Sequence, residues 1–221
     1  MPVRSAVQTL PLRWFTLRRR VIATGLVAAA VAAWALHPTG AVDLADGKAM
    51  RHSGLKAAWQ AGNVAVLVRH GERCDRSNNA CLGDADGITL AGSRVASNVG
   101  DGLQALGMGN AQVLTSPLTR TQQTAMFMFG AAATPQDWLM NCRKTMLKDV
   151  VAHKQPGHNM VLVTHSECMN ALEQQAGIHG GDGPGYASAL FVSIDPVTGT
   201  PKVLGDLNAS EWPRLLRHFK G

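Results

Sequence analysis

The sequence lacks a basic surplus in its body, internal repeats and long low-complexity tracts. Its formal net charge is +6, but five arginines and no acidic residue fall within the first 36 positions. Without those arginines, 16 basic and 15 acidic residues remain, so the rest of the chain has no surplus charge for releasing counterions from a polyanion. The composition therefore excludes a nucleic-acid-binding protein.

Disorder and a collagen-like structure are also excluded, because charged residues make up only 16% of the chain and hydrophobic residues 46%. With 221 residues, the chain is long enough to bury one sizeable core and too short for two ordinary enzyme domains. We expect a single domain over residues 48–221, with a short appendage before it.

The appendage has the organisation of an export leader. Residues 1–20 are basic, and residues 21–36 form an apolar run without a charged residue. This run is longer than a minimal signal-peptide core and slightly short for a comfortable membrane span. Because the arginines lie only before it, the positive-inside rule places the N-terminus in the cytoplasm and the body across the membrane. We predict a signal anchor at 21–36, a linker at 37–47 and a periplasmic domain held at the inner membrane, with a cleaved signal peptide as the alternative.

Four cysteines lie in the exported part, and an even number in an oxidising compartment is typical of disulfides. Of three possible pairings, we favour Cys74 with Cys81, which closes a short polar loop, and Cys142 with Cys168. A metal site is the alternative, but no two cysteines have the two-residue spacing of a zinc knuckle and no histidine lies at ligand spacing from them. The sequence therefore predicts two disulfides and no metal.

Continuous apolar runs predict strands that are covered on both faces of a sheet. Such runs occur at 64–68 and 160–164, and a further short strand is predicted at 111–115. A helix is predicted at 48–61, another at 90–106 after the N-cap Thr89, and a third at 117–129 with Pro117 in its first turn. Further helices are predicted at 139–153 and 167–175, and a terminal hairpin is predicted from strands at 187–194 and 202–204. Alternating strands and helices predict an α/β fold, a three-layer sandwich with a mainly parallel sheet.

Each of the three predicted parallel strands leads into charged or reactive residues. The first leads into Arg69, His70 and Arg73, the second into a segment that ends at Arg120, and the third into His165. Because the carboxyl ends of parallel strands lie at one edge of a sheet, we expect two histidines and three arginines to meet there. Such a cluster repels itself unless it binds an anion, and phosphate suits both guanidinium groups and a helix N-terminus.

Histidine chemistry then becomes the natural expectation for this cluster. Neutral imidazole attacks phosphorus well, and water can hydrolyse the phosphohistidine that forms. Arginines at the phosphoryl oxygens supply the charge stabilisation that magnesium provides in other phosphoryl transferases, so no metal and no other cofactor is required. The cluster therefore indicates an enzyme that acts on phosphate esters.

Three motifs in this order resemble the histidine phosphatase superfamily, whose fold is described as phosphoglycerate mutase-like. They are Arg69-His70-Gly71 after the first strand, Ser116 to Arg120 followed by Thr121-Gln122-Gln123-Thr124-Ala125, and Thr164-His165 late in the chain. The resemblance covers residues 64–194. A lone Arg-His-Gly is a weak signal, whereas the ordered set is specific.

A closer resemblance is to the lipopolysaccharide core heptose(II)-phosphate phosphatases of the bacterial envelope. It rests on the hydrophobic leader and on the positions Arg69-His70, Glu72 to Ser77, Cys81-Leu82, Cys142 and Cys168. This chain departs from that group at Gly71, where the group tends to have alanine. It also has Arg143-Lys144-Thr145 where the group carries an acidic residue shortly after its third cysteine.

The resemblance implies a role for each residue of the cluster. His70 is the expected phosphorylated nucleophile, and His165 is expected to donate a hydrogen bond to the transferring group. Arg69, Arg73 and Arg120 are expected to hold the phosphoryl oxygens, although a salt bridge to a nearby carboxylate is the alternative for Arg73.

The acid that protonates the leaving oxygen has three candidates. Glu167, two residues after His165, is our choice, and Glu72 and Asp75 are its competitors. A glutamate at a helix N-terminus also stabilises the helix dipole without any catalytic role, which is the alternative interpretation of Glu167.

We therefore predict a metal-independent phosphomonoesterase whose substrate is a phosphorylated small molecule or glycan, in particular a phosphorylated sugar of the lipopolysaccharide core. One alternative is a phosphatase of phosphohistidine in proteins. The other is a non-catalytic module that binds a phosphorylated ligand with the same arginine pocket.

Overall fold

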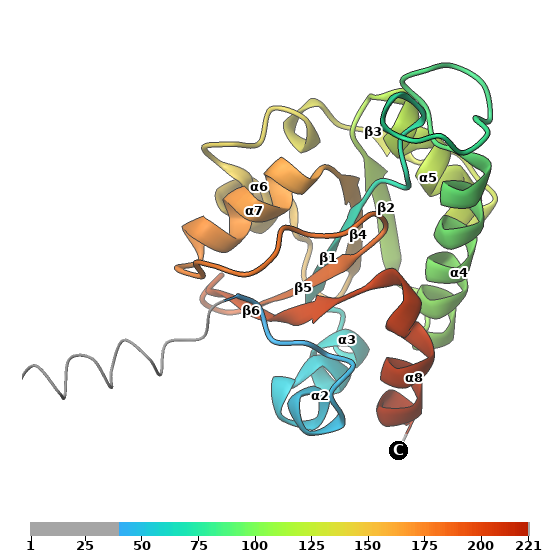
Figure 1. Cartoon of the computed structure of the whole chain (residues 1–221). Coiled ribbons are helices and arrows are strands. Elements are labelled where there is room, and N and C mark those ends of the chain that lie inside the picture. Colours follow the sequence, from blue (N-terminus) through green and yellow to red (C-terminus); the bar gives the residue numbers. More distant parts are fainter. Residues whose placement is uncertain (1–39, 221) are drawn as a thin grey trace, which may run out of the picture. The chain divides into compact units, whose positions relative to one another are not determined.

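The computed structural model describes residues 40–220 (Figure 1). The predicted basic segment 1–20 and the predicted signal anchor 21–36 lie outside these residues, together with the start of the linker. No helix within residues 40–220 combines the length and the apolar character that crossing a membrane requires.

A six-stranded sheet of order β3-β2-β4-β1-β5-β6 forms the centre of the fold. Strands β1 to β4 run parallel, and β5 and β6 are antiparallel to their neighbours. The strands are β1 (Val64–Arg69), β2 (Ala111–Thr115), β3 (Thr134–Pro135), β4 (Asn159–Thr164), β5 (Ala189–Ile194) and β6 (Pro201–Leu207). The mainly parallel sheet and its terminal hairpin are therefore confirmed, and β3 is an addition.

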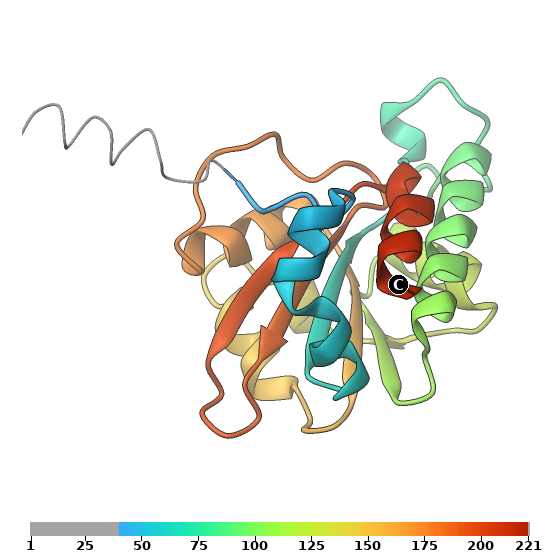
Figure 2. The ribbon, with the colours of Figure 1, turned by 90° about the horizontal axis from the view of Figure 1, so that it is seen from below.

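Helices cover both faces of the sheet, so the predicted three-layer sandwich is present (Figures 1 and 2). One face packs against α2 (Gly47–Ser53), α3 (Leu55–Gln60), α4 (Leu90–Leu106), α5 (Thr119–Phe129) and α8 (Trp212–Lys220). The other face packs against α6 (Met146–His153) and α7 (Ser166–Gln175).

The central strand β1 shows why its sequence is apolar throughout. Val64, Val66 and Val68 belong to the core under the larger helical layer, whereas Ala65 and Leu67 belong to the core under α6 and α7. Successive side chains of a strand point to opposite faces, so a strand buried on both faces loses the alternation of polar and apolar residues.

The prediction of a helix at 139–153 is wrong for its first half. Only the last eight residues of this range are helical, and they form α6. A 3-10 turn at Asp137–Leu139 precedes it, and Cys142 is bonded to Cys168 on α7. The Thr164 hydroxyl also donates a hydrogen bond of 2.7 Å to the Leu139 carbonyl. These bonds hold the segment against the end of β4 in a conformation that is not helical.

Two further helix boundaries differ from their predicted positions. The segment 48–61 is divided into α2 and α3 at Gly54, whose φ of 79° ends the first helix in the left-handed conformation. Pro117 lies before α5 rather than in its first turn, because Leu118 is the N-cap.

The short helix α8 was not predicted, and residues 40–47 pack more closely than a linker suggests. Trp212, Leu215 and Phe219 bury one side of α8 against the sheet. Leu44 is fully buried, and its N–H donates a hydrogen bond of 2.9 Å to the Asp206 carbonyl of β6.

The long helix α4 begins at the predicted cap, since the Thr89 hydroxyl accepts a hydrogen bond of 2.9 Å from the Gly92 amide. Its glycines allow other segments to approach closely. A Cβ at Gly100 would lie 2.0 Å from the Met128 carbonyl oxygen of α5, and one at Gly92 would lie 2.7 Å from the backbone nitrogen of Glu72. These contacts set the distance between α4, α5 and the segment that follows β1.

Candidate active site

The carboxyl ends of three parallel strands meet at the site. In the register of the sheet, Arg69 at the end of β1 is paired with Thr164 at the end of β4. The His70 amide then donates to the Thr164 carbonyl at 2.9 Å, and the Ser116 amide after β2 donates to the Val163 carbonyl at 3.0 Å. This pairing brings residues from three distant parts of the chain to one edge of the sheet.

His70 follows β1 and is only 3% exposed. Its Nδ1 lies 2.8 Å from the Gly71 carbonyl, to which it donates, so the lone pair of the neutral ring is on Nε2. The next amide, that of Gly71, donates to Thr124 Oγ1 of α5 at 2.9 Å and holds the turn in place. Burial, together with the charges of His165 and nearby arginines, lowers the pKa of His70 to about 3. The ring is therefore neutral at physiological pH.

His165 follows β4, and its ring centroid lies 5.4 Å from that of His70. Its Nε2 is 2.9 Å from Ser116 Oγ, which is 2.8 Å from Thr121 Oγ1. Because Thr121 donates to the Leu118 carbonyl at 2.7 Å, the hydrogen-bond order makes Nε2 of His165 a donor. Its other nitrogen, Nδ1, is buried and has no partner within residues 40–220.

The three predicted arginines surround His165 with positive charge. Burial lowers the pKa of His165 to about 4, and repulsion from Arg120, Arg73 and Arg69 contributes to this shift. The arginines are not equivalent, however, because their own partners differ.

Arg69 and Arg120 are half-buried, and their guanidinium groups are incompletely satisfied. In both, the Nε atom is buried without a hydrogen-bond partner, and neither forms an ion pair with a carboxylate in the described part of the chain. Arg69 donates through Nη1 to the Pro184 carbonyl at 2.7 Å. Burial lowers the pKa of both side chains. Unpaired buried cations are costly, so this arrangement favours an anionic ligand.

Arg73, by contrast, is paired with Asp75. Its Nε donates to Asp75 Oδ1 at 2.7 Å, and its Nη2 contacts the second carboxylate oxygen. The hydrogen bonds to Asp75 raise the pKa of Arg73. Arg73 thus adds positive charge to the site while its guanidinium group is bound to Asp75. This pair is the salt bridge that the sequence offered as an alternative for Arg73.

The three acidic candidates also occupy different environments. Glu72 accepts hydrogen bonds from Thr89 Oγ1 at 2.7 Å and from Asn79 Nδ2 at 2.9 Å, so it ties the segment after β1 to the start of α4. Asp75 is bound to Arg73. Glu167 is exposed in the first turn of α7, and its carboxylate raises the pKa of His165.

The ionisation of Glu167 reflects opposing influences. Burial raises its pKa, but hydrogen bonding to its own amide and attraction to His165 and Arg120 outweigh burial and hold the pKa below its usual value. Of the three candidates, Glu167 is therefore the one whose carboxylate interacts with cations of the pocket and is not held by hydrogen bonds to another segment of the described chain.

Tyr186 is a site residue that the sequence analysis missed. Its ring centroid lies 5.8 Å from that of His70 and 4.0 Å from the guanidinium carbon of Arg69. It precedes Ala187, a buried residue with φ of 55° whose amide donates to the His70 carbonyl at 3.3 Å. The available signal was compositional, because Tyr186 is the only tyrosine of the chain.

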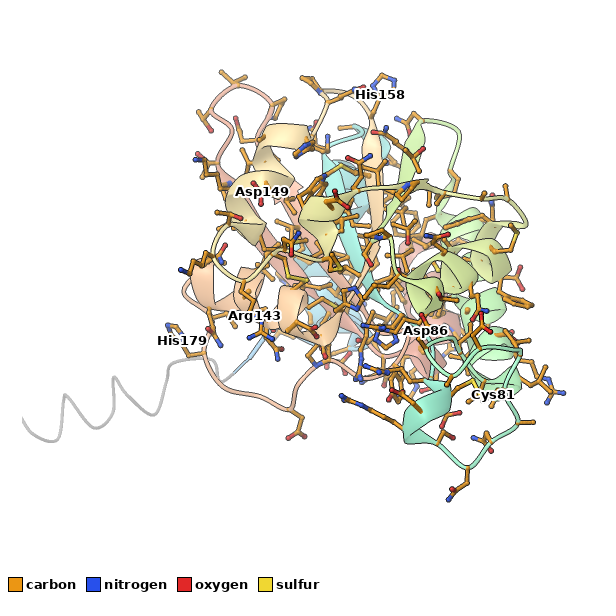
Figure 3. All side chains as sticks on the ribbon, turned by 90° about the horizontal axis from the view of Figure 1, so that it is seen from above. Cys81, Asp86, Arg143, Asp149, His158 and His179 are labelled. Carbon is orange, nitrogen blue, oxygen red and sulfur yellow. A yellow bond between two sulfur atoms is a disulfide. The ribbon has the colours of Figure 1, made fainter. Side chains whose placement is uncertain are left out.

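Both favoured disulfides are present, Cys74 with Cys81 and Cys142 with Cys168. The first closes the segment between β1 and α4, in which Cys81 and Asp86 lie together in Figure 3. Arg143 lies on the opposite side of the same view. Within residues 40–220, no group of three or more histidine, cysteine or acidic side chains is placed to hold a metal ion.

A family model described as the histidine phosphatase superfamily, branch 1, matches residues 65–139. Among known proteins, the chain is similar to proteins named lipopolysaccharide core heptose(II)-phosphate phosphatase. The protein from Salmonella typhimurium is 34% identical over 136 residues, which are 60% of this chain and 66% of the relative. The one from Shigella flexneri is 38% identical over 113 residues, 49% of this chain and 56% of the relative. The chain thus covers less than two thirds of the length of these relatives.

Among solved structures, the chain resembles a phosphoserine phosphatase mutant from Entamoeba histolytica, with a TM-score of 0.53 and 12% identity over 67% of this chain and 98% of the other. It also resembles the protein histidine phosphatase SixA complexed with tungstate, with a TM-score of 0.50 and 14% identity over 66% and 97%. These similarities support the phosphoglycerate mutase-like fold.

Proposed function

Because a histidine phosphatase superfamily model matches residues 65–139 and the similar proteins are named as phosphatases, we propose that the chain belongs to this superfamily and hydrolyses phosphate monoesters through a phosphohistidine intermediate on His70. One observation carries this proposal. The neutral ring of His70 has its Nε2 free, near two half-buried arginines whose buried Nε donors lack partners within residues 40–220. A nucleophile next to unsatisfied donors for equatorial oxygens suits transfer of a phosphoryl group.

In the first step, Nε2 of His70 attacks phosphorus and the bond between phosphorus and the ester oxygen breaks. Arg69 and Arg120 bind the phosphoryl oxygens, and Arg73 adds positive charge from its pair with Asp75. The arginines stabilise the charge on the transferred group, so the step requires no metal ion. The leaving oxygen takes up a proton as the bond breaks.

We assign that proton to Glu167, because Glu72 and Asp75 are held by other partners. The pKa of Glu167 lies below its usual value while the arginines have no anion beside them. A bound phosphate dianion offsets these charges and raises the pKa, which favours the acid form. In the second step, the Glu167 carboxylate removes a proton from water, the water oxygen attacks phosphorus, and the bond to His70 breaks.

His165 completes the pocket on the side of β4. Its Nε2 is held by Ser116, so the unpaired Nδ1 is the atom left to interact with the phosphoryl group. A proton taken up at Nδ1 when the anion binds turns this atom into a donor to a phosphoryl oxygen.

The substrate class that we propose is a phosphorylated sugar of the cell envelope. The relatives at 34% to 38% identity are named for lipopolysaccharide core heptose(II)-phosphate. An export leader with an anchor at 21–36 is consistent with action in the periplasm at the inner membrane.

Trapping of the phosphoenzyme in an alkaline, denaturing quench tests the mechanism, because phosphohistidine hydrolyses in acid. The full chain is mixed with a 32P-labelled phosphate ester and quenched, and protein-bound label is measured under conditions that preserve phosphohistidine. We expect label on the wild type that is lost from the variant His70→Asn. Hydrolysis without any trapped label on His70, or unchanged turnover by His70→Asn, rejects the mechanism. Binding of phosphate without hydrolysis identifies the non-catalytic module instead.

A further inference from the structure

A groove with a volume of about 470 Å³ shares Tyr186 with the surroundings of His70 and Arg69. Its lining residues come from the middle of α4, the segment before β5 and the 3-10 turn Ala209–Glu211 that leads into α8. Tyr186 belongs to both the groove and the pocket, because it lines the groove while its ring faces His70 and Arg69. A group bonded to a phosphate in the pocket therefore has this groove as its neighbour.

The lining of the groove combines polar side chains with apolar surface, and its one charged side chain within residues 40–220, Glu211, is paired with Arg214. It is formed by Val95, Asn98, Tyr186, Asn208, Ala209, Ser210 and Glu211. Amides, a hydroxyl and a carboxylate supply donors and acceptors together, which suits a ligand whose groups do both. The carboxylate disfavours a second phosphate, and the polar side chains disfavour an acyl chain. The Tyr186 ring offers one flat apolar surface.

Several of these side chains are already ordered. Asn208 Nδ2 donates to Glu211 Oε2 at 3.2 Å, and Arg214 contacts Glu211 Oε1 at 3.4 Å. The Ser188 amide donates to the Gly185 carbonyl at 3.1 Å, closing a turn around Tyr186 in which Ala187 has its positive φ. A non-glycine residue at such a φ costs energy, so the surrounding structure holds the turn in place and Tyr186 with it.

We propose that this groove binds the alcohol part of the substrate and selects a hydroxyl-rich ring, a sugar, that packs against Tyr186. The volume falls within the range of small-molecule sites. Hydroxyl groups of the sugar exchange hydrogen bonds with Asn98, Asn208 and Ser210, and its C–H groups contact the tyrosine ring. This inference rests on the proposed phosphatase function and adds the residues that determine which ester is used.

The test compares the phosphate ester of a sugar with the phosphate ester of a ring without hydroxyl groups. One is a heptose phosphate esterified at a secondary ring hydroxyl, and the other is cyclohexyl phosphate, which has the same kind of ester on a bare ring. The full chain is assayed with the variants Asn98→Ala and Ser210→Ala. Asn110→Ala is the matched control, since Asn110 is an exposed asparagine at the opposite end of β2 that donates to the Gly157 carbonyl.

We expect the wild type to prefer the heptose ester in kcat/KM and Asn98→Ala to reduce that preference about tenfold, the value of one good hydrogen bond. Asn110→Ala should keep the wild-type preference. A wild type that uses both esters equally, or an unchanged preference in both groove variants, overturns the groove and leaves the phosphatase intact. Hydrolysis of neither ester by the wild type overturns the phosphatase and the groove with it.

Chemical modification gives a readout that does not depend on turnover. Tyr186 is the only tyrosine, so nitration by tetranitromethane reports on this side chain alone. Free heptose should slow nitration of the wild type at lower concentration than it slows nitration of Asn98→Ala. Equal protection of both proteins by heptose, or protection of neither, contradicts binding of the sugar in the groove.

Discussion

The carboxyl edge of the sheet contains buried polar atoms without partners in the described part of the chain, whereas the interface between α4 and α5 is tightly packed. At the carboxyl edge, Arg69, Arg120 and His165 have buried polar atoms that no residue of 40–220 satisfies. At α4, by contrast, the backbone of α5 approaches so closely that Gly100 has no room for a methyl group. The first region thus lacks hydrogen-bond partners among the described residues, and the second lacks free space.

This difference separates the residues that serve function from those that serve stability. Unpaired cations at the edge of the sheet repel each other and weaken the empty protein, whereas a bound anion satisfies them. The closely packed glycines of α4 fix the segment that carries Glu72 and Thr89, and they are not among the residues that line the groove. Substitutions in the two regions should therefore change activity and stability independently.

Replacement of the nucleophile should give the largest effect. We expect His70→Asn to lower kcat roughly 10³-fold or more, because no other group of the pocket can form the covalent intermediate. The free energy of unfolding, measured by urea denaturation, should stay within about 1 kcal/mol of the wild type, since a buried neutral ring is exchanged for a smaller polar group. A loss of activity that only follows a loss of folded protein would place His70 with the structural residues.

The second prediction concerns a phosphate-binding arginine. Arg120→Met keeps most of the aliphatic stem and removes the charge, so kcat/KM should fall roughly 10²-fold to 10³-fold. The free energy of unfolding should be unchanged or rise by about 1 kcal/mol, because a buried unpaired donor disappears. Arg217→Met, at an exposed arginine of α8, is the control and should change neither quantity. A destabilised Arg120→Met protein contradicts the view that the pocket stores unsatisfied charge.

The sequence was sufficient to predict the convergence of the cluster. The apolar runs of β1 and β4 can be recognised without a structure, and parallel pairing then places His70 and His165 at one edge. Both disulfides were also predictable, because the number of cysteines is small and one pair lies close in the chain.

The parts that could not be predicted depend on distant contacts. Tyr186 reaches Arg69 across a separation of more than one hundred residues, and the turn that directs it requires an unusual φ at Ala187. The non-helical path of residues 140–145 results from the bond of Cys142 to α7, against a helical local pattern. The glycines of α4 weaken a helix by propensity, whereas the structure uses them for close packing.

The third prediction probes the packing of α4. Gly100→Ala should lower the free energy of unfolding by about 2 kcal/mol, because the added methyl meets the Met128 backbone, which cannot rotate away. Gly109→Ala is the matched control, since a Cβ there meets nothing within 4 Å and the variant should be as stable as the wild type or slightly more stable. The folded fraction of Gly100→Ala should retain its kcat. A large fall in kcat at full folding would join α4 packing to the site.

The smallest effect is the dependence of stability on pH. The pKa values of His70 and His165 are lowered from 6.5 to about 3 and about 4, so the unfolded state binds more protons between these values and 6.5. Stability is therefore complete above pH 6.5 and falls as the pH decreases, by about 1 kcal/mol for each histidine between pH 7 and pH 5.5. Asp206 acts in the opposite direction, because burial raises its pKa to about 6.

The variant His70→Asn/His165→Asn separates these contributions, because it keeps Asp206 and lacks both histidines. Urea denaturation at pH 7 and pH 5.5 should show a loss of stability in the wild type that is about 2 kcal/mol larger than in the double variant. Saturating phosphate should reduce the loss in the wild type, since a bound anion raises the pKa of both histidines toward their values in the unfolded chain. An identical change of the unfolding free energy with pH in the two proteins would show that the histidines are not held neutral by burial and the neighbouring arginines. The contrast between the charged edge and the packed helix would then lose its electrostatic basis.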